Sequence, residues 1–350
     1  MAKSLYEISE ADLKIWLKDN GFKTFRSKQI IDWIFKKFIL NPCDMLNIPK
    51  KLQNALNNEF ICNSAKIEKI QCASDGTEKL LISYSGTNDA VECVIIPSAK
   101  RITFCLSTQI GCPVKCTFCA SGQHGLQRNL SAGEILEQLL LCSKAINAKP
   151  DNIVFMGVGE PMLNIKNLII ALDFISGTDY FALGQRHITI STSGIVNGIL
   201  KLANLKRQYN LAVSLHAPND ALRERIIPSE LRANIKDILE ACVEYRAQTT
   251  RMVTLEYILI KNLNNSHKNA IELAKLAKEY YTKINIIPYN KVDEVSYLPP
   301  TEKDITSFIN ILEENGAKVT RRIKRGDDSD AACGQLRNRN ILSREPKPKL

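Results

Sequence analysis

Three cysteines of the 350-residue chain lie within eight residues, in the segment Cys112-Pro-Val-Lys-Cys116-Thr-Phe-Cys119. The segment follows an apolar run that predicts a strand, and it precedes a predicted helix start at Ser131, so we expect a loop. Three thiolates can bind three irons of a [4Fe–4S] cube, whose usual ligands are four cysteines, and leave one iron open. An open position is typical of catalytic metal centres. Zinc is the alternative, because His124 would complete a structural Cys₃His site.

The elements that must position this loop alternate between strands and helices beyond residue 100, which indicates parallel strands. Six such units predict an α/β fold with an open or partial (β/α)₆ barrel of the TIM type, whose chemistry lies at the carboxyl ends of the strands. The predicted strands are 102–107, 152–157, 187–192, 211–215, 253–260 and 283–289. The predicted helices lie near 131–147, 164–176, 195–205, 230–246, 266–281 and 303–315.

The first hundred residues follow other patterns. Apolar positions in 6–60 recur every three or four residues, which predicts helices. Short alternating runs between 64 and 97, separated by Asp-Gly and Ser-Gly turn signals, predict β-hairpins. We therefore expect an N-terminal accessory domain over 1–98, a barrel over 99–325 and a basic C-terminal tail over 326–350. Ser131 and Thr301, each followed three residues later by an acid, predict capped helix starts.

The charge of the chain favours a polyanionic partner. Lys and Arg exceed Asp and Glu by 47 to 37, which gives a formal charge of +10 and a pI near 9.0. Residues 318–350 hold ten basic residues against four acids. Such a cluster is the electrostatic signature of nucleic-acid binding through phosphate contacts.

Composition also indicates where the chain works. No stretch approaches the ~20 apolar residues that span a bilayer, and the first residues lack the order of a signal peptide, so we expect a cytoplasmic protein without membrane contact. Eleven cysteines in a reducing compartment favour metal binding or catalysis over structural disulfides. The isolated ones are expected to be small buried hydrophobes: Cys43, Cys62, Cys72, Cys93, Cys142 and Cys242.

Several further motifs carry a family resemblance. The C-x₃-C-x₂-C loop with Phe118 before its last cysteine, and the turn Gly157-Val-Gly159-Glu160-Pro161, resemble radical SAM enzymes, which use S-adenosylmethionine (SAM). Together with the segments below, the chain resembles the RlmN/Cfr family of radical SAM RNA methyltransferases. These segments are Val91-Glu92-Cys93 to Pro97, Cys105, Arg128-Asn-Leu130, Ser191-Thr-Ser-Gly194, Ser214 to Asp220, Ile287-Pro-Tyr-Asn290 and Ala331-Ala-Cys333-Gly-Gln.

The resemblance implies a methyltransferase that acts on carbon 2 of adenine, in 23S rRNA and beside the anticodon of tRNAs. Carbon 2 lies between two ring nitrogens and is too electron-poor for an ordinary methyl transfer, a difficulty that a radical route overcomes. The resemblance implies that a [4Fe–4S] cluster and two SAM per turnover provide this route. It assigns Cys333 as methyl carrier, Cys105 as the thiol that resolves a covalent RNA adduct by a disulfide, and Glu92 as proton acceptor. On residue type alone, Cys105 would be an inert buried thiol and Glu92 a solvated strand residue.

The resemblance further implies SAM contacts at the ends of successive strands: Gly159, Glu160, Ser191, Ser214, Leu215, His216 and Asn290. His216 could otherwise be a core histidine and Ser191 a helix cap. An electron donor such as a flavodoxin system and a monomeric state are also expected. The alternatives are a family member acting at carbon 8, a non-catalytic zinc RNA-binding protein and a radical SAM enzyme with a small-molecule substrate. Lys291 after Asn290 and the wording of 326–330 depart from the family pattern.

Overall fold

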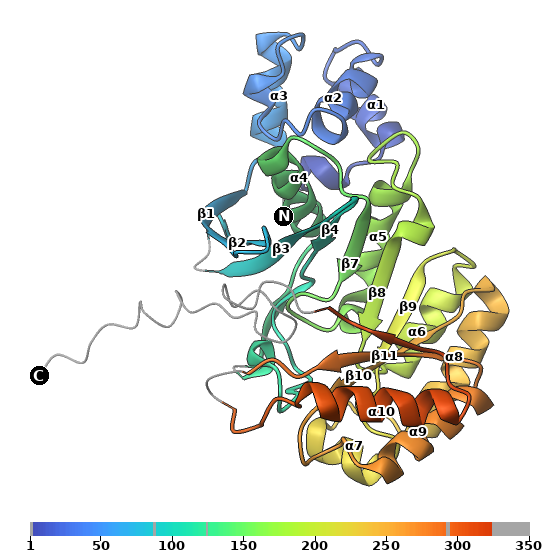
Figure 1. Ribbon diagram of the computed structural model, residues 1–350. Coiled ribbons are helices and arrows are strands. Elements are labelled where there is room, and N and C mark those ends of the chain that lie inside the picture. The colour runs from blue at the N-terminus through green and yellow to red at the C-terminus, as the bar shows by residue number, and fades with distance from the viewer. Residues whose placement is uncertain (1–2, 87–88, 124, 292–294, 324–350) are drawn as a thin grey trace, which may run out of the picture.

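A continuous ten-stranded sheet runs through the molecule in the order β1-β2-β3-β4-β7-β8-β9-β10-β11-β12 (Figure 1). The computed structural model describes residues 3–86, 89–123, 125–291 and 295–323. A separate two-stranded sheet pairs β5 with β6. The strands are β1 (Ala65–Cys72), β2 (Glu78–Tyr84), β3 (Ala90–Ser98), β4 (Arg101–Cys105), β5 (Gln109–Gly111), β6 (Leu126–Asn129), β7 (Asn152–Phe155), β8 (Ile188–Thr192), β9 (Asn210–Ser214), β10 (Thr254–Leu259), β11 (Lys283–Pro288) and β12 (Val319–Arg321).

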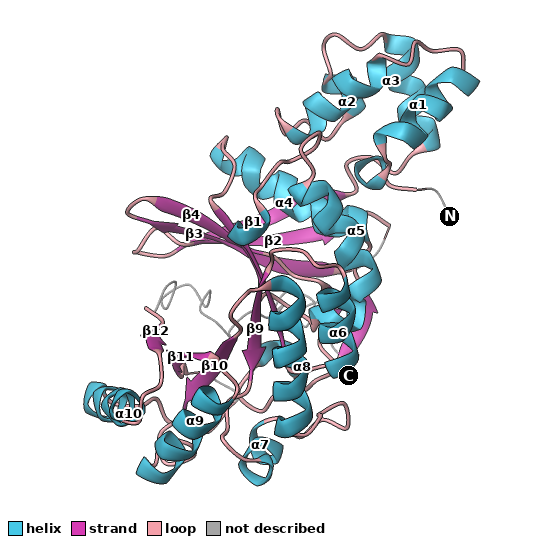
Figure 2. Ribbon diagram, turned by 90° about the vertical axis from the view of Figure 1, so that its right-hand side faces the viewer, coloured by secondary structure: helices cyan, strands magenta, loops and turns pink. Residues whose placement is uncertain are grey.

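Strands β4 and β7 to β11 are the six predicted parallel strands, and they confirm the α/β partial barrel. Helices follow the strands along the chain and cover the outer face of the curved sheet (Figure 2). β12, parallel to β11, was not predicted because it is only three residues long. The helices are α1 (Glu10–Asp19), α2 (Arg26–Phe35), α3 (Lys50–Glu59), α4 (Ala132–Ile146), α5 (Ile165–Ser176), α6 (Val196–Asn204), α7 (Asp220–Ile226), α8 (Ile235–Thr249), α9 (His267–Glu279) and α10 (Glu302–Glu314).

Alternation along the parallel strands decides which face each residue occupies. Ile153 of β7, and Ile188 and Ile190 of β8, are fully buried in the main core beneath the helices, and Phe155 joins the same core at the end of β7, where it also lines the pocket. Their neighbours in sequence point to the inner face, where Ser191 remains partly exposed. Because side chains alternate strictly, the small and polar residues between the core positions must line the inside of the barrel.

The N-terminal part forms helices and then hairpins, as predicted. Helices α1 to α3 gather at one end of the molecule (Figure 1). Strands β1, β2 and β3 pair antiparallel, and β3 continues the sheet by pairing antiparallel with β4. The boundary expected at 98/99 therefore falls in the hairpin between two paired strands, so β1 to β3 are an extension of the barrel sheet.

Two helix starts and several helix ends follow the sequence pattern closely. Ser131 and Thr301 both form the predicted capping boxes, with Glu134 and Asp304 respectively. The helix predicted from 230 begins at Ile235 instead, because the Ile235 amide is held by the Asp220 carboxylate at 2.9 Å. Among the described residues, none of the helices has the length and apolar character needed to cross a membrane.

The isolated cysteines divide into three groups, and Cys62 alone is half-buried. Cys93, Cys142 and Cys242 are buried as predicted, and the Sγ atoms of Cys93 and Cys142 are 3.3 Å apart. The prediction was wrong for Cys43 and Cys72, which are exposed. Cys43 lies in a short 3₁₀ turn and Cys72 ends β1, the outermost strand of the sheet, so neither has a layer above it.

Candidate functional site

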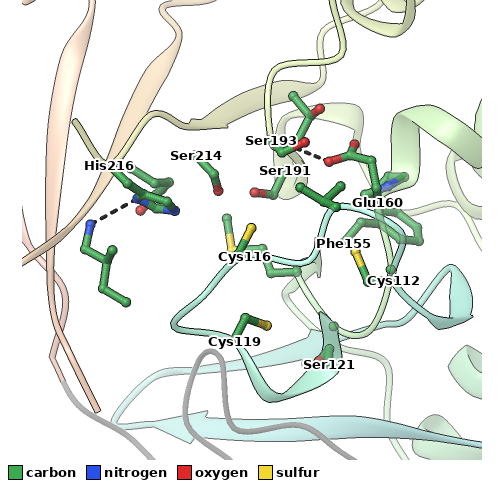
Figure 3. Close-up of a pocket in the computed structure, with 18 of the residues that line it drawn as sticks. Cys112, Cys116, Cys119, Ser121, Phe155, Glu160, Ser191, Ser193, Ser214 and His216 are labelled. Atoms are coloured by element: carbon green, nitrogen blue, oxygen red, sulfur yellow. Dashed lines mark hydrogen bonds between the residues drawn. The ribbon is translucent and has the colours of Figure 1, made fainter. Parts of the chain in front are cut away.

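A pocket opens at the carboxyl ends of the parallel strands, and Cys112, Cys116 and Cys119 line one side of it (Figure 3). Their loop connects β5 to β6, and the Cys112 amide donates to the carbonyl of Gly125 at 3.0 Å. Among the described residues, no three His, Cys, Asp or Glu side chains converge on one point that could hold a single metal ion. Thiolates on an iron–sulfur cube each bind a different iron, so they need to surround a volume rather than meet at one atom.

Helix α7 supports the cysteine loop from behind. The amide and hydroxyl of Thr117 donate to the carbonyl of Ile226, the last residue of α7, at 3.0 and 3.1 Å. The Thr117 hydroxyl also lies 3.0 Å from the hydroxyl of Tyr297. Phe118 and Ile226 belong to one buried apolar cluster against which the three cysteines pack. The loop is therefore fixed by packing and hydrogen bonds.

Burial keeps the thiols of Cys112 and Cys116 protonated when no metal is bound. Desolvation raises the pKa of Cys112 to about 12 and raises the pKa of Cys116 well above its usual range. Nearby thiols and Glu160 add to the effect in both cases. A bound metal ion has the opposite effect, because its positive charge lowers the pKa of a coordinating thiol and deprotonates it. The donor set, three thiols around an open pocket, fits a three-cysteine iron–sulfur cluster.

The glycine turn after β7 forms the next wall. A Cβ on Gly157 would lie 2.4 Å from the Ser107 hydroxyl, and one on Gly159, whose φ is +107°, would lie 2.6 Å from the Gln109 Cβ. Only glycine allows the turn to approach the segment after β4 this closely. The turn delivers Glu160 into the pocket, where the carboxylate accepts from the backbone amides of Ser193 and Met162.

Glu160 is 3% exposed, and desolvation raises its pKa while the backbone hydrogen bonds oppose the rise. Ser193, whose amide donates to Glu160, directly follows β8, and Glu160 itself lies in the turn after β7. The carboxylate therefore links the ends of two neighbouring strands. A buried carboxylate with remaining lone pairs is a suitable acceptor for an ammonium group.

His216 is held as a neutral donor on the opposite wall. It is 3% exposed, and desolvation, reinforced by the charge of Arg223, lowers its pKa to about 3. Its Nδ1 accepts from the backbone amide of Ile258 at 3.1 Å, so the ring proton is on Nε2. The edge of Phe118 meets the ring with centroids 4.9 Å apart. The alternative of a satisfied core histidine does not describe a ring that lines the pocket.

The remaining residues expected to contact SAM lie at different depths. Ser191 and Ser214 line the pocket together with Gly159, Glu160 and His216. Leu215 is fully buried, and its backbone amide and carbonyl are occupied by Glu256 and Arg223. Asn290 is 6% exposed, and its Oδ1 is a buried acceptor with no hydrogen-bond partner among the described residues. That oxygen is satisfied only if a donor reaches it.

Glu92 and Cys105 occupy the same face of the sheet as the pocket. Cys105 pairs with Val94, and Glu92 lies two residues from Val94, so both side chains point to one face. Cys105 also pairs with Val154, which lies two residues before the pocket residue Met156. Both are buried, at 6% exposure each, so Glu92 is not the solvated strand residue that its type alone suggests.

Glu92 has a partner that sequence reasoning missed. The ammonium of Lys79, on the neighbouring strand β2, is 3.3 Å from its Oε1, and both side chains are at most 7% exposed. Two further expected residues, Cys333 and the zinc ligand candidate His124, lie outside the described residues.

Other pocket residues were also not predicted, chiefly Glu256, Arg322 and Ser193. Glu256 is 4% exposed, pairs with Ser214 in register and accepts from Asn285 Nδ2 at 2.8 Å. An acid in an otherwise apolar alternating strand was the available signal. Desolvation raises its pKa, opposed by the charge of Arg322.

The barrel, the three-cysteine loop and the strand-end pocket define a radical SAM enzyme, and comparison with known proteins agrees. The radical SAM superfamily matches residues 106–283, and membership implies a [4Fe–4S] cluster and SAM as cofactors. The N-terminal domain of ribosomal RNA large subunit methyltransferases matches residues 3–62.

Full-length comparison narrows the class to one family. The chain is 40% identical to a probable dual-specificity RNA methyltransferase RlmN of Clostridium perfringens, over 98% of this chain and 99% of that protein. It is 41% identical to one from Clostridium botulinum, over 96% and 98% of the two chains. A radical SAM methyltransferase structure from Sphaerobacter thermophilus superposes with a TM-score of 0.92 at 36% identity, covering 96% of this chain and 99% of that one. The chain belongs to the RlmN family of radical SAM RNA methyltransferases.

Proposed function

We propose that this enzyme methylates carbon 2 of adenine in two RNAs, at one position of 23S rRNA and at the adenine 3′ of the anticodon in tRNAs. The observation that carries the proposal is the shared face of the sheet. The cysteine loop and its pocket, the buried thiol of Cys105 and the buried carboxylate of Glu92 all face the inside of one barrel. A methyl transfer that uses only SAM as an electrophile would need neither of the last two groups.

In this proposal Cys112, Cys116 and Cys119 hold the cluster. Glu160 accepts from the SAM amino group, and Gly159, Ser191, Ser214, His216 and Asn290 complete the SAM site, while Leu215 supports it from the core. The bound cofactors supply one-electron cleavage of SAM and removal of a hydrogen atom. The neutral imidazole of His216 can donate from Nε2, and Asn290 Oδ1 can accept the hydrogen bond that it lacks.

The covalent steps fall to three side chains. The Cys333 thiolate takes a methyl group from a first SAM, forming an S–C bond and releasing S-adenosylhomocysteine. After that methyl loses a hydrogen atom and its carbon bonds to carbon 2 of adenine, the adduct gives up one electron to a one-electron acceptor, a role that the oxidised iron–sulfur cluster would fill, and Glu92 takes the carbon 2 proton. Cys105 then forms a disulfide with Cys333 as the bond between the Cys333 sulfur and the methylene breaks, and the methylene gains a proton.

The rest of the chain positions the RNA. We propose that residues 1–98 are an RNA-binding accessory domain and that the basic tail 326–350 carries Cys333 to the pocket. The adenine must be turned out of its stack to reach the barrel. A monomeric enzyme in the cytoplasm, reduced by a flavodoxin-like donor, completes the proposal, since both RNAs and such donors are found there.

The test is anaerobic turnover with defined RNAs. The protein is reconstituted with iron and sulfide and given SAM, a reductant and either protein-free 23S rRNA or tRNA, and the digested nucleosides are separated by mass spectrometry. We expect 2-methyladenosine from both RNAs, with no product from Cys333→Ala. Cys43→Ser, at an exposed thiol far from the pocket in sequence, is the matched control and should retain full activity.

Three outcomes would contradict the proposal in different ways. 8-Methyladenosine would assign the carbon 8 reaction. One bound zinc without SAM cleavage would support the zinc RNA-binding alternative. SAM cleavage that is indifferent to RNA would point to a small-molecule substrate.

A further inference from the structure

Arg223 of α7 is the largest fully buried side chain of the described residues, at 0% exposure. Its guanidinium donates to three backbone carbonyls: Nε to Leu215 at 3.2 Å, Nη1 to Ala233 at 3.0 Å and Nη2 to Ser193. Ser193 follows β8 and Leu215 follows β9, so one side chain joins the ends of two strands that supply pocket residues. Arg223 itself stands behind the pocket wall.

The charge of Arg223 lacks the usual counter-ion. Among the residues that the structure describes, no carboxylate lies within ion-pair distance of it, and its hydrogen-bond acceptors are all neutral carbonyls. Desolvation lowers its pKa to about 10, so it remains a cation at neutral pH. A buried charge without an opposite charge is costly and is retained where another group compensates it.

The cysteine loop can supply that compensation once its thiols are ionised, in addition to Asp220 at the start of α7. Ile226, one turn further along α7, accepts both hydrogen bonds from Thr117, the residue that follows Cys116. Once Cys116 is ionised as a metal ligand, its thiolate provides the largest electrostatic interaction that favours the charged guanidinium, ahead of the Asp220 carboxylate. A cube on three thiolates is anionic, and it gains one more negative charge on reduction.

We propose that Arg223 is the fixed counter-charge of the iron–sulfur cluster, holding its reduction potential up while fastening the ends of β8 and β9 around the SAM pocket. The inference rests on the proposed cysteine ligands. One electron from the external donor reduces the cluster, and the added negative charge is stabilised by the buried guanidinium across a region of low dielectric. Arg223 is a positioning residue, because it touches neither substrate nor SAM in this arrangement.

Two substitutions separate its charge from its hydrogen bonds. Arg223→Lys and Arg223→Gln both lose the three-pronged contact with the carbonyls, but only Lys keeps the cation. Arg232→Gln is the matched control, since Arg232 is a partly exposed cation near α7 that pairs with Glu224. All are purified anaerobically with the cluster loaded, and the midpoint potential is measured by a redox titration followed by EPR. SAM affinity is measured in parallel.

We expect the ratio of reduced to oxidised cluster at a fixed solution potential to be about tenfold lower in Arg223→Gln. This corresponds to a fall in the midpoint potential of about 59 mV for a one-electron couple. Arg223→Lys and Arg232→Gln should keep the potential of the unsubstituted enzyme. Both Arg223 variants should bind SAM more weakly, because the strand ends are released. An equal fall in the Lys and Gln variants, or no fall in Gln, would overturn the inference.

If the Gln variant does not fold or load a cluster, the Lys variant still decides the test. Because Arg223→Lys keeps the positive charge, a lowered midpoint potential in this variant is enough to contradict the role of the charge. Failure of the proposed function looks different. In that case the unsubstituted protein would hold no cluster or would not cleave SAM, and no potential could be attributed to it.

Discussion

The glycine turn that delivers Glu160 can be tested with three alanine substitutions that differ in how they fail. Gly21→Ala places a Cβ at φ +75° in open space, so only the backbone conformation is strained. Gly157→Ala meets the Ser107 hydroxyl at 2.4 Å and the Leu106 carbonyl at 2.8 Å without a positive φ. Gly159→Ala combines a φ of +107° with a contact of 2.6 Å.

The magnitudes follow from these geometries. A positive φ at a residue with a Cβ costs about 1–2 kcal/mol, and forcing an atom into a packed interior costs about 1–3 kcal/mol. The expected loss of unfolding free energy is therefore about 1 kcal/mol for Gly21→Ala, about 2 kcal/mol for Gly157→Ala and about 3–4 kcal/mol for Gly159→Ala. Urea unfolding of the cluster-free proteins measures all three.

The two turn variants should also bind SAM more weakly once the cluster is loaded, because the amide of Glu160 is held by Gln109 Oε1 at 2.7 Å and moves with the turn. Gly21→Ala should bind SAM normally. The reasoning is refuted if Gly159→Ala is no less stable than Gly21→Ala, or if both turn variants keep full SAM affinity.

Three more predictions follow from single side chains. His216 has a pKa of about 3 in the folded state and about 6.5 in the unfolded state, so between these values only the unfolded state binds the proton, and acidification destabilises the fold. From pH 7 to pH 5 the unfolding free energy should therefore drop by about 2 kcal/mol more than in His216→Gln, and equal pH slopes in the two proteins would contradict a buried neutral ring. Glu92→Gln breaks the buried ion pair with Lys79, so the unfolding free energy measured in urea should fall by about 3 kcal/mol. The double variant Glu92→Gln with Lys79→Met should recover part of that loss, whereas additive losses from the two substitutions would show that the side chains are not coupled. Thr117→Val removes the hydrogen bond from the hydroxyl to the Ile226 carbonyl while keeping the side-chain shape, so the unfolding free energy should fall by about 1 kcal/mol. The loaded variant should also lose iron to a chelator faster, and an unchanged rate of iron release would show that α7 does not hold the loop.

Much of the barrel could be predicted because its signals are local. The six parallel strands are apolar runs that end at residues 105, 155, 192, 214, 259 and 288. The capping boxes at Ser131 and Thr301 fixed two helix starts, because an acid three residues after a hydroxyl is a specific pattern.

What could not be predicted depends on contacts between distant segments. β12 is too short to carry a pattern, and α7 is a helix of seven residues whose role comes from its contact with a loop a hundred residues earlier. The pairing of Lys79 with Glu92 depends on the register of β2 and β3, in which Lys79 lies opposite Val94 and therefore diagonally across from Glu92 on the same face. Glu256 and Arg223 were missed for the same reason, since burial of a charged side chain is set by the fold around it.

The site was predictable where residue type and spacing specify chemistry. The three cysteines of the 112–119 loop were expected from their type and spacing, Glu160 and His216 were expected from the family resemblance, and all five line one pocket. Leu215 was expected in the same set because it lies between Ser214 and His216, yet alternation in β9 directs its side chain into the core. A sequence motif therefore identifies the segment that forms the site, whereas the alternation of side chains along the strand decides which residues of that segment line the pocket.

In the proposed reaction the methyl group passes through Cys333 and a carbon radical before it reaches adenine. SAM with a trideuterated methyl group tests this directly in single turnover of enzyme whose Cys333 has not been methylated beforehand, with the product nucleoside analysed by mass spectrometry. We expect a product methyl with two deuteriums and one hydrogen, because one deuterium is removed before the carbon bonds to adenine and the methylene later gains a proton. A product that keeps all three deuteriums would contradict it.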